Sequence, residues 1–325
     1  MSEVLLELNH LEKRFPLEAG LFARYGRFVY AVNDVSIKLH RGESYGLVGE
    51  SGCGKTTLAR LAIQMYKQDG GEILYHGRNS GSLKLSELNR KELFNYRTKV
   101  KYVFQDPARS LNPRMTIYKI LTAGYRQSPH WPGEQNAREE AAEMMRTVGL
   151  NPDDLDRRPS DFSGGQRQRV SIARALIMKP ELLICDEVVS ALDVSIQSQI
   201  LNLLLELKEK FKLTMLFIAH DLTVTSYLCD RIGVMYRGRI MEEAAAQDLV
   251  QHRFHPYTRL LYDSIPSRMN RDMNLSGFEP FDSTRALKGC PFYHRCGSRT
   301  EKCHNRPPME DLKEDHLTAC YHPCQ

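Results

Sequence analysis

A glycine-rich run near the N-terminus carries the clearest chemistry of the sequence. Residues 49–56 match the pattern G-x-x-x-x-G-K-[ST] at each fixed position. Strand-like residues over 44–48 precede the run, and apolar residues at helical spacing over 56–65 follow it. Backbone amides and a helix N-terminus attract phosphate groups in this context. We therefore expect a nucleotide to bind Gly49, Glu50, Ser51, Gly52, Cys53, Gly54, Lys55, Thr56 and Thr57.

This loop and a later strand together predict an ATPase. We expect Lys55 to reach the β- and γ-phosphates of ATP, and the Thr56 hydroxyl to bind Mg2+. A buried apolar strand is predicted over 181–186, and its last residue, Asp186, is followed by Glu187. Beside a phosphate loop, Asp186 is expected to hold magnesium, and Glu187 is placed to polarise the attacking water.

Size and composition limit the other possibilities. The chain has 325 residues, which favours one large domain with an appendage. Its net charge of +5 comes from 45 basic and 40 acidic residues without a long basic block, so we predict no nucleic-acid partner. The sequence contains no apolar run of membrane-spanning length, and its N-terminal stretch has acids where a signal peptide would be apolar. We therefore expect a chain that stays in the cytosol.

The pattern of elements predicts an α/β fold. Strand-like alternation over 4–11 and 35–39 precedes the glycine-rich run, and helical periodicity over 137–148 and after Ser163 predicts a helical subdomain at about 113–178. Strands over 181–186 and 214–219 are separated by a helix over 197–210, an order that implies a parallel sheet. We expect one domain over 1–265. A polar, cysteine-rich extension over 266–325 has too few apolar residues for its own core.

A second glycine turn narrows the class. Phe162 leads into Ser163, Gly164, Gly165 and Gln166, and a helical pattern follows them. The chain resembles ATP-binding-cassette (ABC) proteins, whose signature is such a turn at a helix N-terminus, usually entered by leucine. The resemblance implies that Ser163, Gly164, Gly165 and Gln166 bind the γ-phosphate held by the opposite subunit of a dimer, again through amides and a helix dipole. It also implies an antiparallel β subdomain.

Other positions follow the same resemblance in order along the chain. It implies that Gln105 touches magnesium and the attacking water, that Asp193 couples the two sites, and that His220 contacts the γ-phosphate. The family aromatic that stacks on adenine corresponds to Phe15 or to Tyr30. Either aromatic is about as suited to a core position, so both assignments stay open.

Three stretches resemble the subfamily of oligopeptide, dipeptide and nickel importers: 104–116, 190–195 and 255–261. This implies peripheral attachment at the cytoplasmic face of the membrane, a second and related ABC ATPase subunit, two transmembrane permease subunits, and an extracellular or periplasmic substrate-binding protein. Val188 stands where proline is usual, which removes no catalytic group. The transported substrate, and pairing with itself or with a related chain, are left open.

The extension concentrates five of the eight cysteines. A close C-x2–4-C pair typical of zinc is absent, so spacing alone leaves zinc and an iron–sulfur cluster open. Resemblance to peptide-importer ATPases implies a [4Fe-4S] cluster, with Cys324 as an alternative ligand and nearby histidines keeping Zn2+ as the alternative. The implied cluster ligands are Cys290, Cys296, Cys303 and Cys320.

Two other functions use the same motifs. One is a soluble ABC ATPase of DNA repair or translation, although those usually fuse two cassettes and this chain has one phosphate loop and one signature. The other is the ATPase subunit of an exporter, although exporters commonly carry their membrane domain on the same chain. We expect an import ATPase that converts ATP and water to ADP and phosphate.

Overall fold

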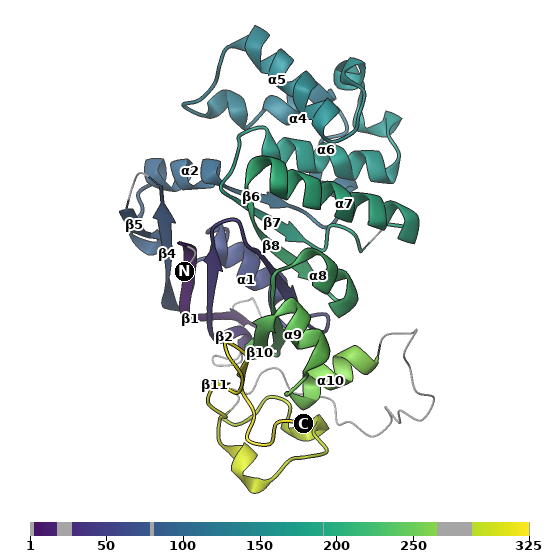
Figure 1. Cartoon of the computed structure of the whole chain (residues 1–325). Coiled ribbons are helices and arrows are strands. Elements are labelled where there is room, and N and C mark those ends of the chain that lie inside the picture. The colour runs from purple at the N-terminus through teal and green to yellow at the C-terminus, as the bar shows by residue number, and fades with distance from the viewer. Residues whose placement is uncertain (1–2, 18–27, 79–80, 191, 265–287, 325) are drawn as a thin grey trace. The chain divides into compact units, whose positions relative to one another are not determined.

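The computed structural model describes residues 3–17, 28–78, 81–190, 192–264 and 288–324 (Figure 1). The chain forms two compact units. The first comprises Met1–Ser86 and Ile218–Gln325, and the second comprises Glu87–Phe217. Strand β8 (Thr214–Ala219) runs through the second boundary.

An antiparallel sheet forms the first layer of the first unit. Its strands are β1 (Val4–Pro16), β2 (Phe28–His40), β4 (Gly70–Gly77) and β5 (Gly81–Lys84), in the order β2-β1-β4-β5. Leucines of β1 and branched residues of β2 bury one side of this sheet, as the alternation predicts. Both long strands extend past the predicted ranges, because β1 pairs with β2 out to Pro16 opposite Phe28.

A second set of strands in the first unit carries the phosphate loop. Buried β3 (Ser44–Val48) pairs in parallel with β9 (Arg231–Tyr236), which pairs antiparallel with β10 (Arg239–Ala245). The helices of this unit are α1 (Lys55–Ala62), α8 (Leu222–Leu228), α9 (Ala246–Gln251) and α10 (Pro256–Asp263). Helix α1 starts at Lys55, within the glycine-rich run and one residue before the predicted start, and it ends three residues before the expected position.

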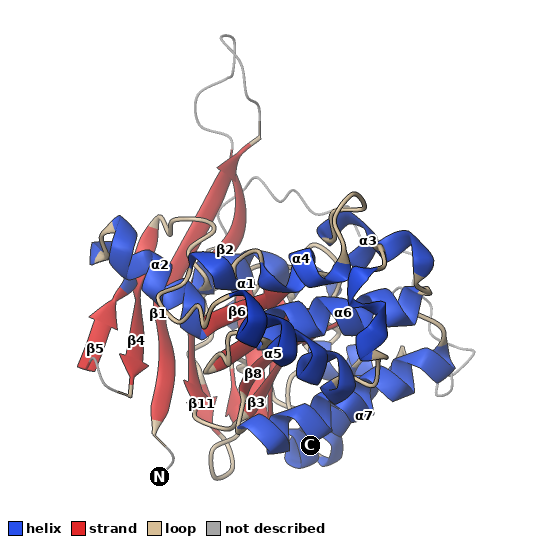
Figure 2. Cartoon of the chain, turned by 90° about the horizontal axis from the view of Figure 1, so that it is seen from above, coloured by secondary structure: helices blue, strands red, loops and turns tan. Residues whose placement is uncertain are grey.

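Helices dominate the second unit. Strands β6 (Val100–Val103) and β7 (Leu182–Asp186) pair in parallel. In Figure 2 the helices α4, α5 and α6 lie side by side, and each packs on the others. The helices are α2 (Arg90–Lys99), α3 (Pro107–Ser110), α4 (Ile117–Thr122), α5 (Glu134–Thr147), α6 (Gly164–Leu176) and α7 (Val194–Phe211). The predicted α/β class with an antiparallel sheet and helical parts is confirmed; the predicted domain limits stay a prediction.

The C-terminal segment, residues 288–324, joins the first unit through a sheet. Strand β12 (Leu317–Thr318) pairs with β10 on one side and with β11 (Glu310–Asp311) on the other. Fully buried His316 lies between two carboxylates, with Nε2 2.8 Å from Glu242 and Nδ1 2.5 Å from Asp248. Burial alone would lower the pKa of His316, but these hydrogen bonds raise it. The segment is thus held largely by strand pairing and buried ionic contacts, which agrees with its low apolar content.

None of the helices in the described ranges is both long and apolar enough to cross a membrane.

Candidate functional site

Lys55, the first residue of α1, is held against the glycine-rich loop. Its ammonium lies 2.7 Å from the carbonyl oxygen of Gly49 and 3.0 Å from that of Glu50, and the residue is 3% exposed. His220, one residue after β8, places Nδ1 3.3 Å from the Lys55 ammonium. The structure thus brings together the two residues expected to meet the γ-phosphate, although 165 positions separate them in the sequence.

Two glycines of the loop are required by its close packing. A Cβ at Gly49 would lie 2.1 Å from the carbonyl oxygen of Met235, and a Cβ at Gly54 would lie 2.0 Å from that of Ala31. Gly52 differs, because its φ of 75° favours glycine while nothing lies within 4 Å of its ideal Cβ. The loop is therefore fixed where it packs on β2 and β9 and open at Gly52.

The start of α1 suits an anion. Its N-cap residue is Gly54, which makes no side-chain cap hydrogen bond, and its first turn contains no acid. The backbone amides of Lys55, Thr56 and Thr57 belong to this first turn, and they lie at the positive end of the helix dipole. Burial raises the pKa of Cys53, so this thiol of the loop is neutral at physiological pH.

The predicted carboxylates lie together in the second unit. Asp186, at the end of β7, is 4% exposed and accepts a hydrogen bond from the Tyr102 hydroxyl. Glu187 accepts one from Nε2 of Gln105 at 2.6 Å. Ser190 lies on the other side of the same turn, with its hydroxyl 2.9 Å from the carbonyl oxygen of Glu187. Tyr102 and Ser190 were not predicted; an aromatic three residues before Gln105 on the adjacent parallel strand was the available signal for Tyr102.

Glu187 has an unusual backbone. Its φ is 50°, in the left-handed region that non-glycine residues seldom adopt. The two residues that follow, Val188 and Val189, are 1% and 5% exposed, and burial of these side chains holds the turn. Such strain is found at functional sites, where it aims a side chain. Here the left-handed backbone turns the Glu187 carboxylate toward Gln105. The turn forms with valine at position 188, where the resemblance leads one to expect proline.

The signature turn starts α6 with a capping box. The Ser163 hydroxyl accepts a hydrogen bond from the Gln166 amide at 3.3 Å, and the Gln166 side chain accepts one from the Ser163 amide at 2.9 Å. A Cβ at Gly165 would meet Cγ2 of Ile196 at 2.7 Å, whereas nothing lies within 4 Å of one at Gly164. Asp193 is the N-cap residue of the next helix, α7, without a side-chain cap hydrogen bond.

The two candidate adenine-stacking residues lie near the ends of paired strands. Phe15, near the end of β1, is partly exposed and meets Tyr66 edge-on at 5.4 Å between ring centroids. Tyr30 of β2 is also partly exposed and is paired with Arg14 of β1. Neither ring is fully buried in a core, so the choice between the two residues stays open.

The four cysteines expected to bind a cluster line one small cavity of the C-terminal segment. Phe292 and His255 line it too. Burial raises the pKa of Cys290 to about 11 and that of Cys320 to about 12, so both thiols are protonated at neutral pH without a metal. All eight cysteines of the chain are free of disulfides. The donor set fits a thiolate-bound group, although no three His, Cys, Asp or Glu side chains in the described ranges are placed to hold a metal ion. The lining cysteines are Cys290, Cys296, Cys303 and Cys320.

The comparisons with known proteins agree with this geometry. Residues 32–190 match the family described as ABC transporter, and residues 241–303 match the family described as oligopeptide/dipeptide transporter, C-terminal region. The chain is 42% identical to oligopeptide transport ATP-binding protein AppF of Bacillus subtilis, over 98% of each protein. It is 46% identical to OppF of the same organism over 82% of this chain and 84% of that protein. The OppF of Haemophilus influenzae is 40% identical over 98% and 97%.

Solved structures support the same assignment. The ATP-binding cassette MJ0796, solved as a dimer in a post-hydrolysis state with ADP and Pi, matches with a TM-score of 0.64 and 27% identity, over 74% of this chain and 99% of that chain. The structure of cbiO1 from Clostridium perfringens, part of the ABC transporter complex cbiONQ, gives 0.64 and 25% over 77% and 92%. The chain therefore belongs to the ABC transporter family, as an ATP-binding subunit of its oligopeptide and dipeptide branch.

Proposed function

We propose that this chain hydrolyses ATP to drive the import of oligopeptides. The observation that carries the proposal is the 42% identity, over 98% of each protein, to a protein named for oligopeptide transport. A phosphate loop and a carboxylate turn with the expected local geometry accompany it. Nothing in these comparisons favours a nucleic-acid ATPase or an exporter.

In the proposed reaction the loop binds the nucleotide and the second unit activates water. Lys55 neutralises the β- and γ-phosphates. Thr56 and Asp186 would hold Mg2+, which would supply polarisation of the phosphate oxygens. Glu187 orients and polarises the attacking water, and Gln105, bonded to Glu187 here, contributes to the same position. His220 stabilises the charge that develops on the γ-phosphate. The products are ADP and phosphate.

A second cassette completes the site in this proposal. The open face of Gly164 supports it, because no contact among the described residues requires glycine there. A phosphate held by another subunit would find the amides of α6 accessible at Gly164 and Gly165, and Ser163 beside them. The second cassette is a related ATPase subunit or a second copy of this chain, and Asp193 at the start of α7 couples the two sites.

A groove of about 310 Å3 in the second unit supports contact with permease subunits. Its lining includes Phe104, the neighbour of Gln105, and apolar residues of α4. Burial lowers the pKa of Lys101 on its wall to about 8. We propose that a cytoplasmic segment of a transmembrane permease fills this groove, so that movement of Gln105 passes to it. The chain then lies peripherally at the cytoplasmic face of the membrane, and an extracellular or periplasmic protein delivers the peptide.

We further propose that Cys290, Cys296, Cys303 and Cys320 hold a [4Fe-4S] cluster. The four thiols line one small cavity, and four cysteine thiolates are the ligand set that such a cluster requires. Anaerobic purification followed by visible absorption and metal analysis tests this. Iron and sulfide at about four each per chain is the expected result; stoichiometric zinc without iron would overturn it.

Import is tested on the assembled complex. The chain is purified with its permeases and binding protein, and the bound ligand is identified by mass spectrometry. Reconstituted in vesicles, the complex should hydrolyse ATP faster when the binding protein carries an oligopeptide, and Glu187→Gln should abolish this increase. A bound metal chelate, with no stimulation by peptides, would contradict peptide import while leaving the ATPase intact.

A further inference from the structure

The C-terminal segment reaches the phosphate loop through one arginine. Arg295 places Nη1 2.8 Å and 2.9 Å from the two carboxylate oxygens of Glu50, the second residue of the loop. The two residues are 245 positions apart in the sequence. The Arg295 side chain is 20% exposed and that of Glu50 is 41% exposed, so the pair lies at the rim of the loop.

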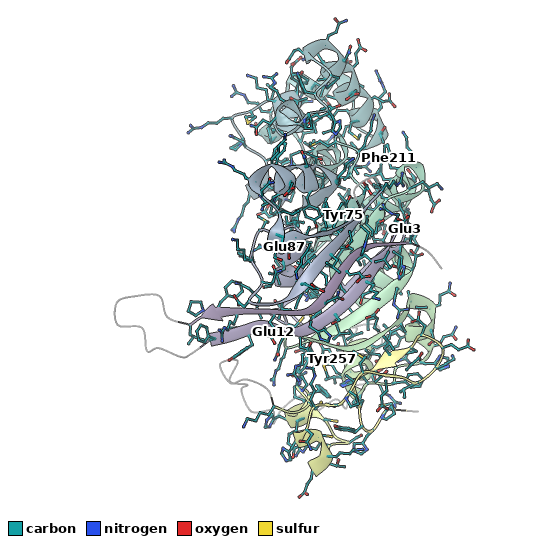
Figure 3. The ribbon with its side chains drawn as sticks, turned by 90° about the vertical axis from the view of Figure 1, so that its left-hand side faces the viewer. Glu3, Glu12, Tyr75, Glu87, Phe211 and Tyr257 are labelled. Atoms are coloured by element: carbon teal, nitrogen blue, oxygen red, sulfur yellow. The ribbon has the colours of Figure 1, made fainter. Side chains whose placement is uncertain are left out.

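A second contact joins the same residue of the loop to α10, which packs on the C-terminal segment. The Glu50 amide donates a hydrogen bond to the Tyr257 hydroxyl at 3.0 Å. Buried Tyr257 packs on Phe292, with ring centroids 5.5 Å apart, and Phe292 lines the cavity of the four cysteines. Figure 3 labels Tyr257 beside the yellow C-terminal segment. Glu50 is therefore fixed at its main chain through Tyr257 and at its side chain by Arg295.

The charge of Glu50 explains why such a clamp matters. A carboxylate in a loop that binds triphosphate repels the ligand, because like charges a few ångströms apart disfavour each other. The Arg295 guanidinium neutralises this carboxylate and holds it against the C-terminal segment. The carbonyl oxygen of Glu50 accepts a hydrogen bond from the Lys55 ammonium at 3.0 Å, and it is held in the same arrangement.

We propose that Arg295 is a positioning residue through which the C-terminal segment raises the affinity of the phosphate loop for ATP. It acts by neutralising and holding Glu50, without touching the nucleotide. The segment is then part of the ATP-binding apparatus of this chain, beyond any metal it carries. The proposal rests on the proposed nucleotide site and is independent of which metal the cysteines bind.

The sign of the effect can be tested by a double change. Arg295→Met, measured with the full chain as purified and with ATP and Mg2+ in a direct binding assay, should weaken ATP binding about two- to five-fold, the range for a partly exposed ion pair. Arg295→Lys should keep most of the wild-type affinity because it retains the charge. Glu50→Ala in the Arg295→Met background should restore affinity, since the repulsive carboxylate is gone.

Arg299 provides the matched control. It is exposed, lies over the Tyr293 ring, and donates to the carbonyl of His294 within the same segment. Arg299→Met should leave ATP binding unchanged. Equal affinity in Arg295→Met and Arg299→Met would overturn the proposal, as would weak binding that Glu50→Ala fails to restore, because a purely structural loss would persist in the double variant.

A reciprocal measurement protects the test against misfolding and against error in the proposed site. Coupling between two sites is mutual, so ADP binding should slow backbone hydrogen exchange over residues 289–304, and Arg295→Met should remove this protection while Arg299→Met keeps it. Unchanged exchange in the wild type on adding ADP would count against the proposal. If Lys55→Ala binds ATP normally, the nucleotide site itself is wrong; if only Arg295→Met has no effect, the coupling alone is wrong.

Discussion

Helices α1 and α6 both begin at glycine turns, and the surroundings of the two turns differ. At α1 the turn makes no side-chain cap, and two of its glycines are forced by backbone oxygens of neighbouring strands. At α6 the turn is capped by its own Ser163 and Gln166, and a Cβ at Gly164 would have none of the described residues within 4 Å. The first turn is shaped from within to receive an anion. The second is complete in itself, and in the proposed mechanism its open glycine faces a ligand that comes from outside the chain.

This difference shows which residues one chain can account for. The requirement for glycine at 49 and 54 follows from distances within the first unit, and so does that at 165 from distances within the second. At position 164, no distance among the described residues requires glycine. Substitutions at the two turns, and at Glu187, should therefore change stability and activity in different proportions.

The largest effect is expected at Glu187. Glu187→Gln should lower ATP hydrolysis by about 10²- to 10⁴-fold, because the amide cannot polarise water, while ATP binding at the α1 turn is retained. Phosphate release and ATP binding are measured on the same preparation. Hydrolysis at the wild-type rate would refute the proposed role of Glu187. The two turns would then have no reaction in common.

Next in size is the loss of the lysine at the α1 turn. Lys55→Ala removes a charge-assisted contact to phosphate and should weaken ATP binding about 10- to 100-fold. Titration with ATP and Mg2+ measures the affinity. As a control, Lys179→Ala, outside both turns, should leave the affinity for ATP unchanged. Equal affinities in the two variants would place the nucleotide elsewhere.

The two signature glycines should separate stability from activity. Gly165→Ala should lower the free energy of unfolding by about 1–3 kcal/mol, because the new methyl group overlaps the stiff side chain of Ile196. Gly164→Ala should leave it unchanged or raise it by up to about 1 kcal/mol, since alanine favours the helix and meets nothing. Urea unfolding measures both. Hydrolysis by the assembled pair should nevertheless fall in Gly164→Ala; an active variant would break the comparison.

The smallest effect is expected at the cap of α6. Ser163→Ala removes the hydroxyl that accepts the Gln166 amide and should cost about 1 kcal/mol of stability. Ser163→Asn, which caps equally well, should restore stability without restoring hydrolysis. Full recovery of both would show that the serine serves the helix alone.

Local chemistry made much of the site predictable. The phosphate loop, the carboxylates after β7 and the capped turn each occupy a short continuous stretch, so residue types and spacing were sufficient. Family resemblance indicated Gln105 as a site residue, but its hydrogen bond to Glu187 was not predicted, because the two residues follow separate parallel strands. Tyr102 was not predicted either: its position three residues before Gln105 was the available signal, and that position does not show that its hydroxyl will meet Asp186.

The C-terminal segment was harder to predict. Its low apolar content correctly indicated that burial alone would not hold it, but the pairing of β12 with β10 joins residues more than 70 positions apart. The contacts of Arg295 with Glu50, and of His316 with Glu242, depend on this long-range register. No periodicity in the sequence marks such partners.

The central claim is that the α1 turn of one cassette works with the α6 turn of another. It is tested by mixing two inactive chains, Lys55→Ala and Gly164→Asp, each with a different affinity tag, and measuring phosphate release from ATP. In mixed dimers one site combines an intact phosphate loop with an intact signature, so hydrolysis should recover part of the wild-type rate although neither chain alone is active. Mixed dimers recovered with both tags and no hydrolysis above the separate chains would contradict the claim.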